Sequence, residues 1–338
     1  MNARVLRVPS NGQARVAREL NQRLGLSELA PPPAIASGMK GHLWEQALLP
    51  LLARGRPLWN PSTSAPIAYR NQVITVHDVA FVDTPQYFSP RFAKTYDFIL
   101  RHASRSARHL IAVSAFSKQR LCDVYGVPEE KVSVIYSGVA DAFTPPTSAA
   151  LSAVVGKFGL TGRPYLVAFS GADPRKNTRG VLDAWARLPR RPAGARLVLF
   201  GRASNASVFG ATAATSLRDD VIAVGGVPDD ELAALYAGSQ GLVFPSYYEG
   251  FGLPVIEAAA SGAPVLTSTA ASLPEIAPPG ALLVDPADTA RIANAMKKLL
   301  ATPPDEAARA RIAGDTRRRF SWDRAAEAHR QLFATLFG

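Results

Sequence analysis

Short apolar runs rich in β-branched residues alternate with longer segments of helical periodicity, and this alternation restricts the fold more than any other feature of the chain. Strands are predicted at residues 73–76, 110–113, 132–135, 165–169, 196–200, 221–224, 241–244, 264–267 and 281–284. Helices are predicted between them, at residues 91–106, 117–125, 178–186, 229–237 and 253–260. Strands that alternate with helices indicate βαβ units and parallel sheets, so the predicted fold class is α/β.

The segment before residue 73 has a weaker strand pattern than the rest of the chain. Residues 3–8 (ARVLRV) are the first candidate strand, and residues 34–37 (AIAS) and 57–60 (PLWN) are further candidates. Two amphipathic helices are predicted here, one within residues 11–24 and one within residues 41–55.

A length of 338 residues suggests two domains. Residues 144–150 (TPPTSAA) interrupt the α/β pattern and have the composition of a linker. We therefore expect a first domain at residues 1–143, a linker at 144–150 and a second domain that starts at residue 151.

Composition excludes several classes of protein. The single cysteine, Cys122, excludes a disulfide framework and a cysteine-based zinc site. No apolar run approaches the ~20 residues of a membrane-spanning helix, and the first residues lack the apolar core of a signal peptide, so we expect a cytoplasmic protein. The net charge of +11 indicates an anionic partner, and residues 1–150 alone carry 17 basic and 10 acidic groups, which leaves +7.

The most informative motif runs from Phe244 to Ala258 (FPSYYEGFGLPVIEA). A predicted strand ends here, a glycine-bearing loop follows, and a helix begins near Leu253, which is an arrangement that holds phosphate groups. Glu249 and Glu257 stand eight positions apart around it. Carboxylates accept hydrogen bonds from vicinal hydroxyls, so this pair is suited to a sugar nucleotide. The alternative is that both are ordinary loop and helix-surface charges.

A second motif follows the predicted strand at 165–169 and reads FSGADPRKNT. Gly171 lets a ligand approach the backbone, and Arg175 and Lys176 stand at the start of a helix. Cations at the carboxyl end of a parallel strand are placed to bind a diphosphate. The alternative is a solvated basic helix start.

These two motifs resemble the E-x7-E and R-K-N elements of the retaining GT-B glycosyltransferases of family 4. The segments VSAFSKQRL, VPEEKVSVIYSGVADAF and LPEIAPPGALLVDP resemble other parts of the same family, in consistent order along the chain. The resemblance implies two Rossmann-like domains that face each other across a cleft, with the acceptor on the first and the nucleotide sugar on the second. It also implies that the second domain ends at residue 320 and that a helix at 321–338, which contains Trp322, crosses back to the first.

The resemblance also implies roles for individual residues of the second domain. Glu257 would bind the ribose and Glu249 the transferred sugar. Arg175 and Lys176 would neutralise the diphosphate in place of a metal, so neither a metal nor another cofactor is expected. Backbone groups would contact the rest of the donor: Gly171 near the phosphates, the amides of Gly250, Phe251, Gly252 and Leu253 on sugar and phosphate, and the loops of Gly201-Arg202 and Gly226-Val227-Pro228 on the base.

In the first domain, the resemblance places His77 and Asp78 at a strand end that faces the donor sugar, where histidine is suited to proton handling. The alternative is a helix-capping Asp78 beside a packed His77. The family's Gly-Gly loop after the first strand is replaced here by Asn11-Gly12-Gln13, which leaves the function of that loop open.

The expected reaction is transfer of a sugar with retention of configuration, by a front-face route in which the leaving phosphate deprotonates the acceptor. GDP-mannose is the expected donor, with UDP- and dTDP-sugars as alternatives, and the acceptor is a saccharide or a lipid-diphosphate-linked saccharide of bacterial polysaccharide assembly.

Arg101, Arg105 and Arg108 are predicted on one helix face, either solvated or in peripheral contact with an anionic membrane. A sugar-nucleotide epimerase and a nucleic-acid-binding protein are the rival classes, and the dispersed charge argues against nucleic acid.

Overall fold

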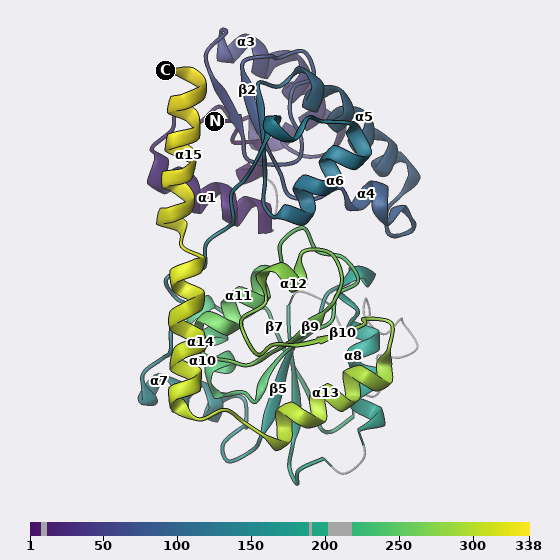
Figure 1. Cartoon of the computed structure of the whole chain (residues 1–338), viewed down its shortest axis with the longest axis vertical. Coiled ribbons are helices and arrows are strands. Elements are labelled where there is room, and N and C mark those ends of the chain that lie inside the picture. Colours follow the sequence, from purple (N-terminus) through teal and green to yellow (C-terminus); the bar gives the residue numbers. More distant parts are fainter. Residues whose placement is uncertain (8–11, 189–190, 202–217) are drawn as a thin grey trace. The chain divides into compact units, whose positions relative to one another are not determined.

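The computed structural model describes residues 1–7, 12–188, 191–201 and 218–338. The chain forms two compact units, one made of Met1–Gly138 with Phe320–Gly338 and the other of Val139–Arg319 (Figure 1). Each unit is built around its own parallel β-sheet, as the alternation of strands and helices predicts. Within the described residues, no helix is long and apolar enough to span a bilayer.

The second unit contains a six-stranded parallel sheet in the order β10-β9-β8-β5-β6-β7. Its strands are β5 (Tyr165–Phe169), β6 (Arg196–Phe200), β7 (Val221–Gly225), β8 (Gly241–Phe244), β9 (Val265–Ser268) and β10 (Leu282–Val284). The chain proceeds outward from β5 to β7 and then returns to place β8 on the other side of β5. This reversal between β5 and β8 is a topological switch point, where open α/β sheets bind ligands at the carboxyl ends of their strands.

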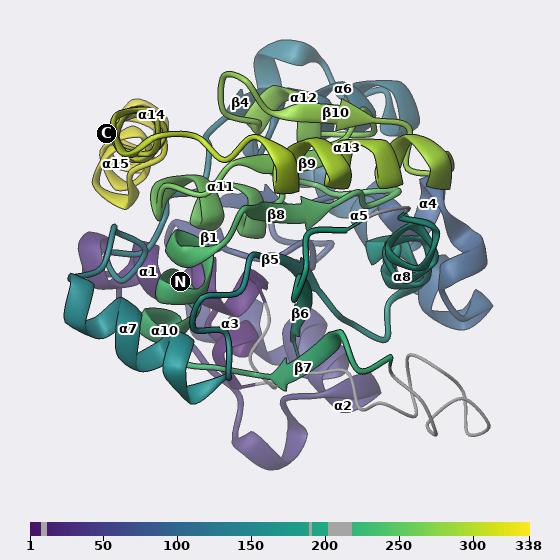
Figure 2. The same cartoon turned by 90° about the horizontal axis from the view of Figure 1, so that it is seen from below.

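Helices cover both faces of this sheet (Figure 2). They are α7 (Ser148–Lys157), α8 (Thr178–Arg187), α10 (Asp229–Gly238), α11 (Leu253–Ala260), α12 (Leu273–Ile276), α13 (Thr289–Ala301) and α14 (Glu306–Arg319). On one face, Trp185 of α8 and Met296 of α13 are fully buried against the strands. Burial of both faces explains why the strands read as apolar runs.

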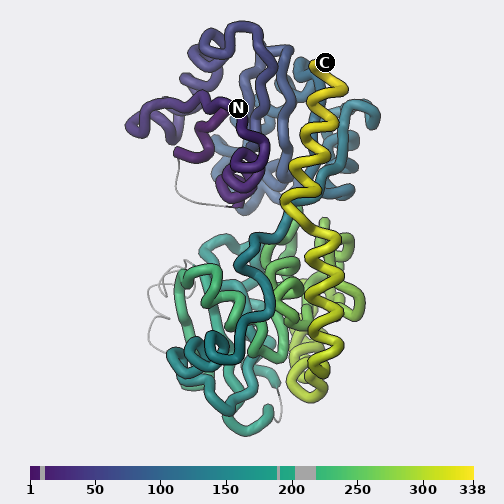
Figure 3. The backbone as a smooth tube through the Cα atoms, turned by 90° about the vertical axis from the view of Figure 1, so that its left-hand side faces the viewer, coloured from purple at the N-terminus to yellow at the C-terminus, as the bar shows by residue number. Residues whose placement is uncertain are grey.

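The first unit contains a four-stranded parallel sheet in the order β1-β2-β3-β4. The strands are β1 (Leu58–Asn60), β2 (Gln72–Val76), β3 (His109–Ala112) and β4 (Val132–Val134). The α-helices are α1 (Gly12–Leu24), α2 (Gly38–Leu43), α3 (Leu49–Ala53), α4 (Ala80–Asp83), α5 (Pro90–Ser106), α6 (Ala115–Tyr125) and α15 (Trp322–Phe337). Helix α15 lies beside α1, where Asp323 accepts a hydrogen bond from Arg23 at 2.8 Å (Figure 3).

The predicted first strand at residues 3–8 is wrong. Asn2 makes a single bridge to Leu29 and donates its backbone N–H to Trp59 at 2.8 Å, but Arg4–Arg7 form a 3-10 helix. The Asn2 side chain accepts the Arg4 N–H at 3.1 Å and turns the chain away from the sheet. The candidate at 34–37 is also wrong, because Pro33–Ile35 are a 3-10 turn, and the PLWN segment supplies β1 instead.

The boundary between the units lies at Gly138 and Val139, earlier than the predicted linker at 144–150. That segment belongs to the second unit, since the Phe143 side chain just before it is fully buried beside the ring of Tyr236. Thr147 then caps α7, with its hydroxyl accepting the Ala150 N–H at 3.3 Å. The proline- and serine-rich composition therefore marks a helix N-terminus rather than a free linker.

Residues 38–53 form one continuous helical segment, made of α2, a π-helical turn (Trp44–Leu48) and α3. Leu49 donates its N–H to the Trp44 carbonyl, five residues back, and Pro50 follows without an N–H to donate. The missing donor at Pro50 accounts for the wider turn at this point. The helix predicted at 41–55 begins at Gly38, three residues earlier than expected.

Candidate active site

The two motifs singled out in the sequence meet at the switch point of the second unit. Strand β5 leads into the turn Pro174–Lys176, and the neighbouring strand β8 leads into the loop that carries Glu249. The backbone joins the two loops, because Tyr247 donates its N–H to the Arg175 carbonyl at 2.8 Å. The strand order thus brings together segments about 70 residues apart in the sequence.

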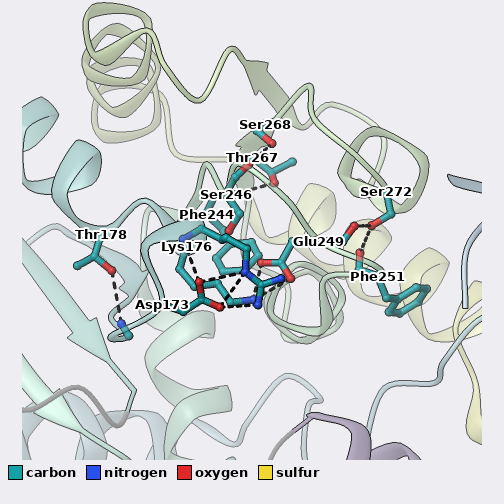
Figure 4. A network of polar contacts seen from close by, with 12 residues as sticks. Asp173, Lys176, Thr178, Phe244, Ser246, Glu249, Phe251, Thr267, Ser268 and Ser272 are labelled. Atoms are coloured by element: carbon teal, nitrogen blue, oxygen red, sulfur yellow. Dashed lines mark hydrogen bonds and ion pairs between the residues drawn. The ribbon is translucent and has the colours of Figure 1, made fainter. Parts of the chain in front are cut away.

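Lys176 and Glu249 form an ion pair across this junction (Figure 4). The Lys176 Nζ lies 2.6 and 2.8 Å from the two carboxylate oxygens of Glu249. It also lies 6.0 and 5.7 Å from the ring centres of Phe169 and Phe244, which end the two strands. Glu249 is only 8% exposed, so the pair is shielded from water on most sides. The ammonium group is therefore held in one place at the mouth of the sheet.

Arg175 is engaged by a carboxylate that the sequence interpretation did not single out. Asp173, two residues earlier, accepts hydrogen bonds from Arg175 Nε at 3.1 Å and from Nη2 at 2.6 Å. Partial burial raises the pKa of Asp173, but the hydrogen bonds and charge of Arg175 outweigh it and hold that pKa below its ordinary value. The guanidinium is thereby oriented, and part of its charge is already neutralised.

Asn177 ties the cationic turn to two other loops. Its backbone is left-handed, with φ of 57°, and its side chain is 4% exposed. The side-chain amide donates to the carbonyl of Pro245 at 3.0 Å and to that of Pro286 at 2.7 Å. These residues follow β8 and β10, so a single side chain fixes Lys176 relative to both. The R-K-N motif contains this residue, but the sequence alone did not indicate its contacts.

Replacing Asn177 with alanine will lower the free energy of unfolding by about 3 kcal/mol, because two buried carbonyls lose their donors and alanine is strained at positive φ. Chemical denaturation measures this loss. Asn177→Gly keeps the backbone freedom and removes only the hydrogen bonds, so it should be less destabilised than Asn177→Ala. Equal stability of the wild type and Asn177→Ala would contradict this account.

The loop that carries Glu249 is held from the β9 side as well (Figure 4). The Ser268 hydroxyl donates to the Ser246 carbonyl at 2.7 Å. The Ser272 Oγ lies 2.9 Å from the carbonyl oxygens of both Glu249 and Phe251, which share its one hydrogen. Gly252 ends the loop with φ of 106°, and a Cβ there would lie 2.7 Å from Leu273. The positive φ at this position favours glycine, and a larger residue would also displace the end of the Leu273 side chain.

Helix α11 begins directly after this loop, at Leu253. The backbone of Gly250, Phe251 and Gly252 is buried with the loop, while Leu253 is half-buried at the helix start. Glu257 lies one turn into the helix and is 6% exposed, which excludes the alternative of a solvated surface charge. In the first turn of α11, Pro254 has no N–H and Val255 donates its N–H to the Gly252 carbonyl at 3.0 Å, so Leu253 supplies the N–H that this helix start can offer to an anion.

The remaining predicted donor contacts lie at the ends of β5, β6 and β7. Gly171 follows β5, and its N–H points to the Thr178 hydroxyl at 3.4 Å. Gly201 has φ of 125°, and a Cβ there would lie 2.2 Å from the Ser170 carbonyl oxygen, so only glycine fits. Val227 is half-buried and Pro228 exposed in the turn before α10. Arg202 lies outside the described residues.

In the first unit, His77 follows β2 and is largely buried. Its Nε2 lies 2.9 Å from the Pro61 carbonyl oxygen, which can only accept, so Nε2 carries the hydrogen. Burial lowers the pKa of His77 and favours the neutral ring, whose Nδ1 is then an acceptor. The Asp78 carboxylate accepts the Ala80 N–H at 3.0 Å in a local turn just before α4, whose N-cap residue is Val79, so Asp78 is not itself the helix cap.

Two other predicted features of the first unit are the Asn11-Gly12-Gln13 loop and the basic face of α5. Asn11 is outside the described residues, and Gly12 and Gln13 open α1. The predicted basic face of α5 is not continuous: Arg101 is paired with Asp97 at 3.2 Å, and Arg108 lies beyond the helix end, 5.2 Å from the ring centre of Phe337. The helix ends at Ser106 because the chain turns there into β3.

Comparison with known families identifies the chain. Residues 156–318 match the model of the group 1 glycosyl transferases, and residues 57–143 match the model of glycosyltransferase family 4. The chain belongs to glycosyltransferase family 4. The fold class predicted from the sequence, two Rossmann-like domains of the GT-B type, is confirmed.

Curated relatives and solved structures agree with membership of family 4. The O-antigen chain mannosyltransferase B of Escherichia coli is 31% identical over 271 residues, which cover 78% of this chain and 70% of that protein. The O-antigen chain mannosyltransferase RfbU of Salmonella typhimurium is 30% identical, over 69% of this chain and 62% of that protein. The crystal structure of WaaG, a glycosyltransferase involved in lipopolysaccharide biosynthesis, has the same fold, with a TM-score of 0.71, 16% identity and coverage of 98% and 97%.

Proposed function

We propose that this glycosyltransferase transfers mannose from GDP-mannose, with retention of configuration, to a saccharide or lipid-diphosphate-linked saccharide acceptor in bacterial polysaccharide assembly. Two mannosyltransferases of O-antigen chains, at 31% and 30% identity, support the choice of sugar. The observation that carries the assignment of the site is the Lys176–Glu249 pair at the switch point between β5 and β8. A nucleotide sugar has its diphosphate and its sugar next to each other, as this cation and carboxylate are.

In the proposed complex, each residue acts through a group that the geometry makes available. Lys176 contacts the diphosphate, oriented Arg175 adds a second positive charge, and the Leu253 N–H at the start of α11 binds a phosphate oxygen. Glu249 accepts hydrogen bonds from the transferred sugar once Lys176 shifts toward the phosphate. Glu257 accepts from the ribose hydroxyls, and the turns at Gly201 and Val227 contact the base.

The proposed step breaks the bond between the anomeric carbon and the β-phosphate oxygen, and forms a bond from the acceptor oxygen to the same face of that carbon. The acceptor proton passes to the departing phosphate oxygen, so the products are the glycoside and the free nucleoside diphosphate. Lys176 and Arg175 stabilise the charge that develops on this phosphate, which is the role that a metal ion fills in other enzymes. A neutral His77 would contribute hydrogen bonding to the donor sugar rather than positive charge.

A screen of GDP-, UDP-, dTDP- and ADP-sugars by thermal shift tests the choice of donor. We expect GDP-mannose to raise the melting temperature most, because a ligand that binds only the folded state stabilises it by mass action. Release of GDP in the presence of acceptor and EDTA would then support metal-independent transfer. A dominant shift with a UDP- or dTDP-sugar would overturn the donor, and appearance of an epimerised nucleotide sugar without diphosphate release would overturn transfer itself.

A further inference from the structure

The helical segment 38–53 exposes an apolar surface that the proposed reaction does not use. Met39, Leu43, Leu48, Leu51 and Leu52, here called the leucine face, are 48, 62, 49, 71 and 46% exposed. They are five of the nine large apolar side chains that are exposed in the described part of the chain. Helix α3, at the margin of the first unit, carries two residues of this surface, Leu51 and Leu52 (Figure 1).

The opposite side of the same segment is also apolar and is packed into the unit. Trp44, Leu49 and Ala53 are at most 4% exposed, and the Gly41 backbone approaches Ala36 so closely that a Cβ would lie 2.3 Å from its carbonyl oxygen. A surface helix of a globular protein is normally polar on the side away from the core. The leucine face is therefore not a by-product of core packing, because the core needs only the other side.

Within residues 29–77, the stretch that contains the leucine face, the exposed charges have one sign. Within residues 29–77 the only acidic residue is Glu45, and it is fully buried by hydrogen bonds from Asn2 and Ser64. The exposed charges of this segment are basic, and Lys40, Arg54 and Arg56 stand at the two ends of the helix. An exposed apolar strip with cations at its margins is complementary to an anionic interface with an apolar interior.

We propose that the leucine face docks the first unit onto an anionic lipid bilayer, with its leucines in the acyl boundary and Lys40, Arg54 and Arg56 among the headgroups. Exposed large apolar side chains that gather on one helical segment indicate an interaction site, and each cation near an anionic surface strengthens the attachment. A second copy of this chain is the less suitable occupant, since two such surfaces would bring their like-charged margins together. The docking does not depend on the donor or on the α5 arginines.

Co-sedimentation with vesicles tests the proposal on the full chain without any substrate. We expect binding to phosphatidylcholine vesicles that contain phosphatidylglycerol, and weaker binding to pure phosphatidylcholine or at high salt. Leu43→Ser with Leu51→Ser should reduce partitioning at least about tenfold, because two apolar side chains no longer enter the bilayer. Lys40→Glu with Arg54→Glu should abolish the preference for the anionic vesicles.

Leu283→Ser is the matched control, since Leu283 is 43% exposed on β10 of the second unit. It should bind vesicles like the wild type, and unchanged circular dichroism should show that each variant is folded. Equal vesicle binding by the leucine variant and the wild type would overturn the proposal. So would a wild-type dimer in sedimentation velocity that the leucine substitutions dissociate while no form binds vesicles. Nucleoside diphosphate release with a soluble acceptor tests the reaction separately.

Discussion

Lys176→Ala will lower kcat by about 10²- to 10³-fold, which is the cost of removing one preorganised group that stabilises developing charge. The Lys176 ammonium lies beside the rings of Phe169 and Phe244 and against the Glu249 carboxylate. Its proposed shift toward the diphosphate takes place when the donor binds, before the moment of reaction. Loss of the Lys176 charge, which stabilises the leaving phosphate, should therefore lower kcat more than it raises the KM for the donor. Steady-state kinetics under saturating donor measure the effect.

The same substitution leaves Glu249 without the cation that accompanies it, so stability must be followed as well. Lys176→Ala with Glu249→Gln removes both charges. Its free energy of unfolding should be close to that of the wild type, although its turnover should be far lower. Arg179→Ala is the control, because Arg179 is an exposed cation on α8, three residues away, that pairs with Asp183. Normal turnover in Lys176→Ala, or an equal loss in Arg179→Ala, would refute the role of Lys176.

Glu257→Gln will weaken the binding of GDP by about 10- to 100-fold while kcat at saturating donor changes little. A carboxylate forms charge-assisted hydrogen bonds with the two ribose hydroxyls, and these are worth roughly 1.5–3 kcal/mol more than none. The ribose is bound equally in the ground state and the transition state, so loss of the Glu257 contact lowers the affinity for GDP rather than the turnover. Isothermal titration calorimetry with GDP measures the change directly.

Glu306→Gln provides the comparison for this experiment, because Glu306 is exposed at the start of α14 in the same unit. This substitution removes one negative charge from the same unit, at a position outside the proposed binding site. Identical GDP affinity in Glu257→Gln and the wild type would remove Glu257 from the binding site. A fall in affinity that is equal in both variants would indicate a general charge effect instead.

Most of the sheet could be predicted from the sequence, because strands buried on both faces leave uninterrupted apolar runs. The predicted bounds of β5, β6, β8 and α11 agree with the structure at both ends. The start of the chain could not be predicted, since ARVLRV has a strand composition. Its 3-10 turn depends on the Asn2 side chain and on partners at Leu29 and Trp59, which only the folded chain brings close.

In the candidate site, the residue types could be predicted from the sequence, but most of the contacts between them could not. Its cations, carboxylates and glycines could be located from motif spacing, because the carboxyl ends of parallel strands collect at one edge of a sheet. The pairing of Lys176 with Glu249 could not, as it requires the strand order that places β8 next to β5. The engagement of Arg175 by Asp173 is a local contact, and a sequence search for acidic neighbours of Arg175 could have found it.

The first unit is discontinuous, since Phe320–Gly338 complete it after 181 residues (139–319) of the second. Trp322 and Ala326 of α15 are buried against Trp59, Val73 and Ile111 in one core. During synthesis at roughly 5–20 residues per second, that apolar surface would stay uncovered for about 10–40 s after residue 138 has been made. The first unit is thus completed after the second, and its exposed apolar surface can promote aggregation of the nascent chain until residues 320–338 have been made.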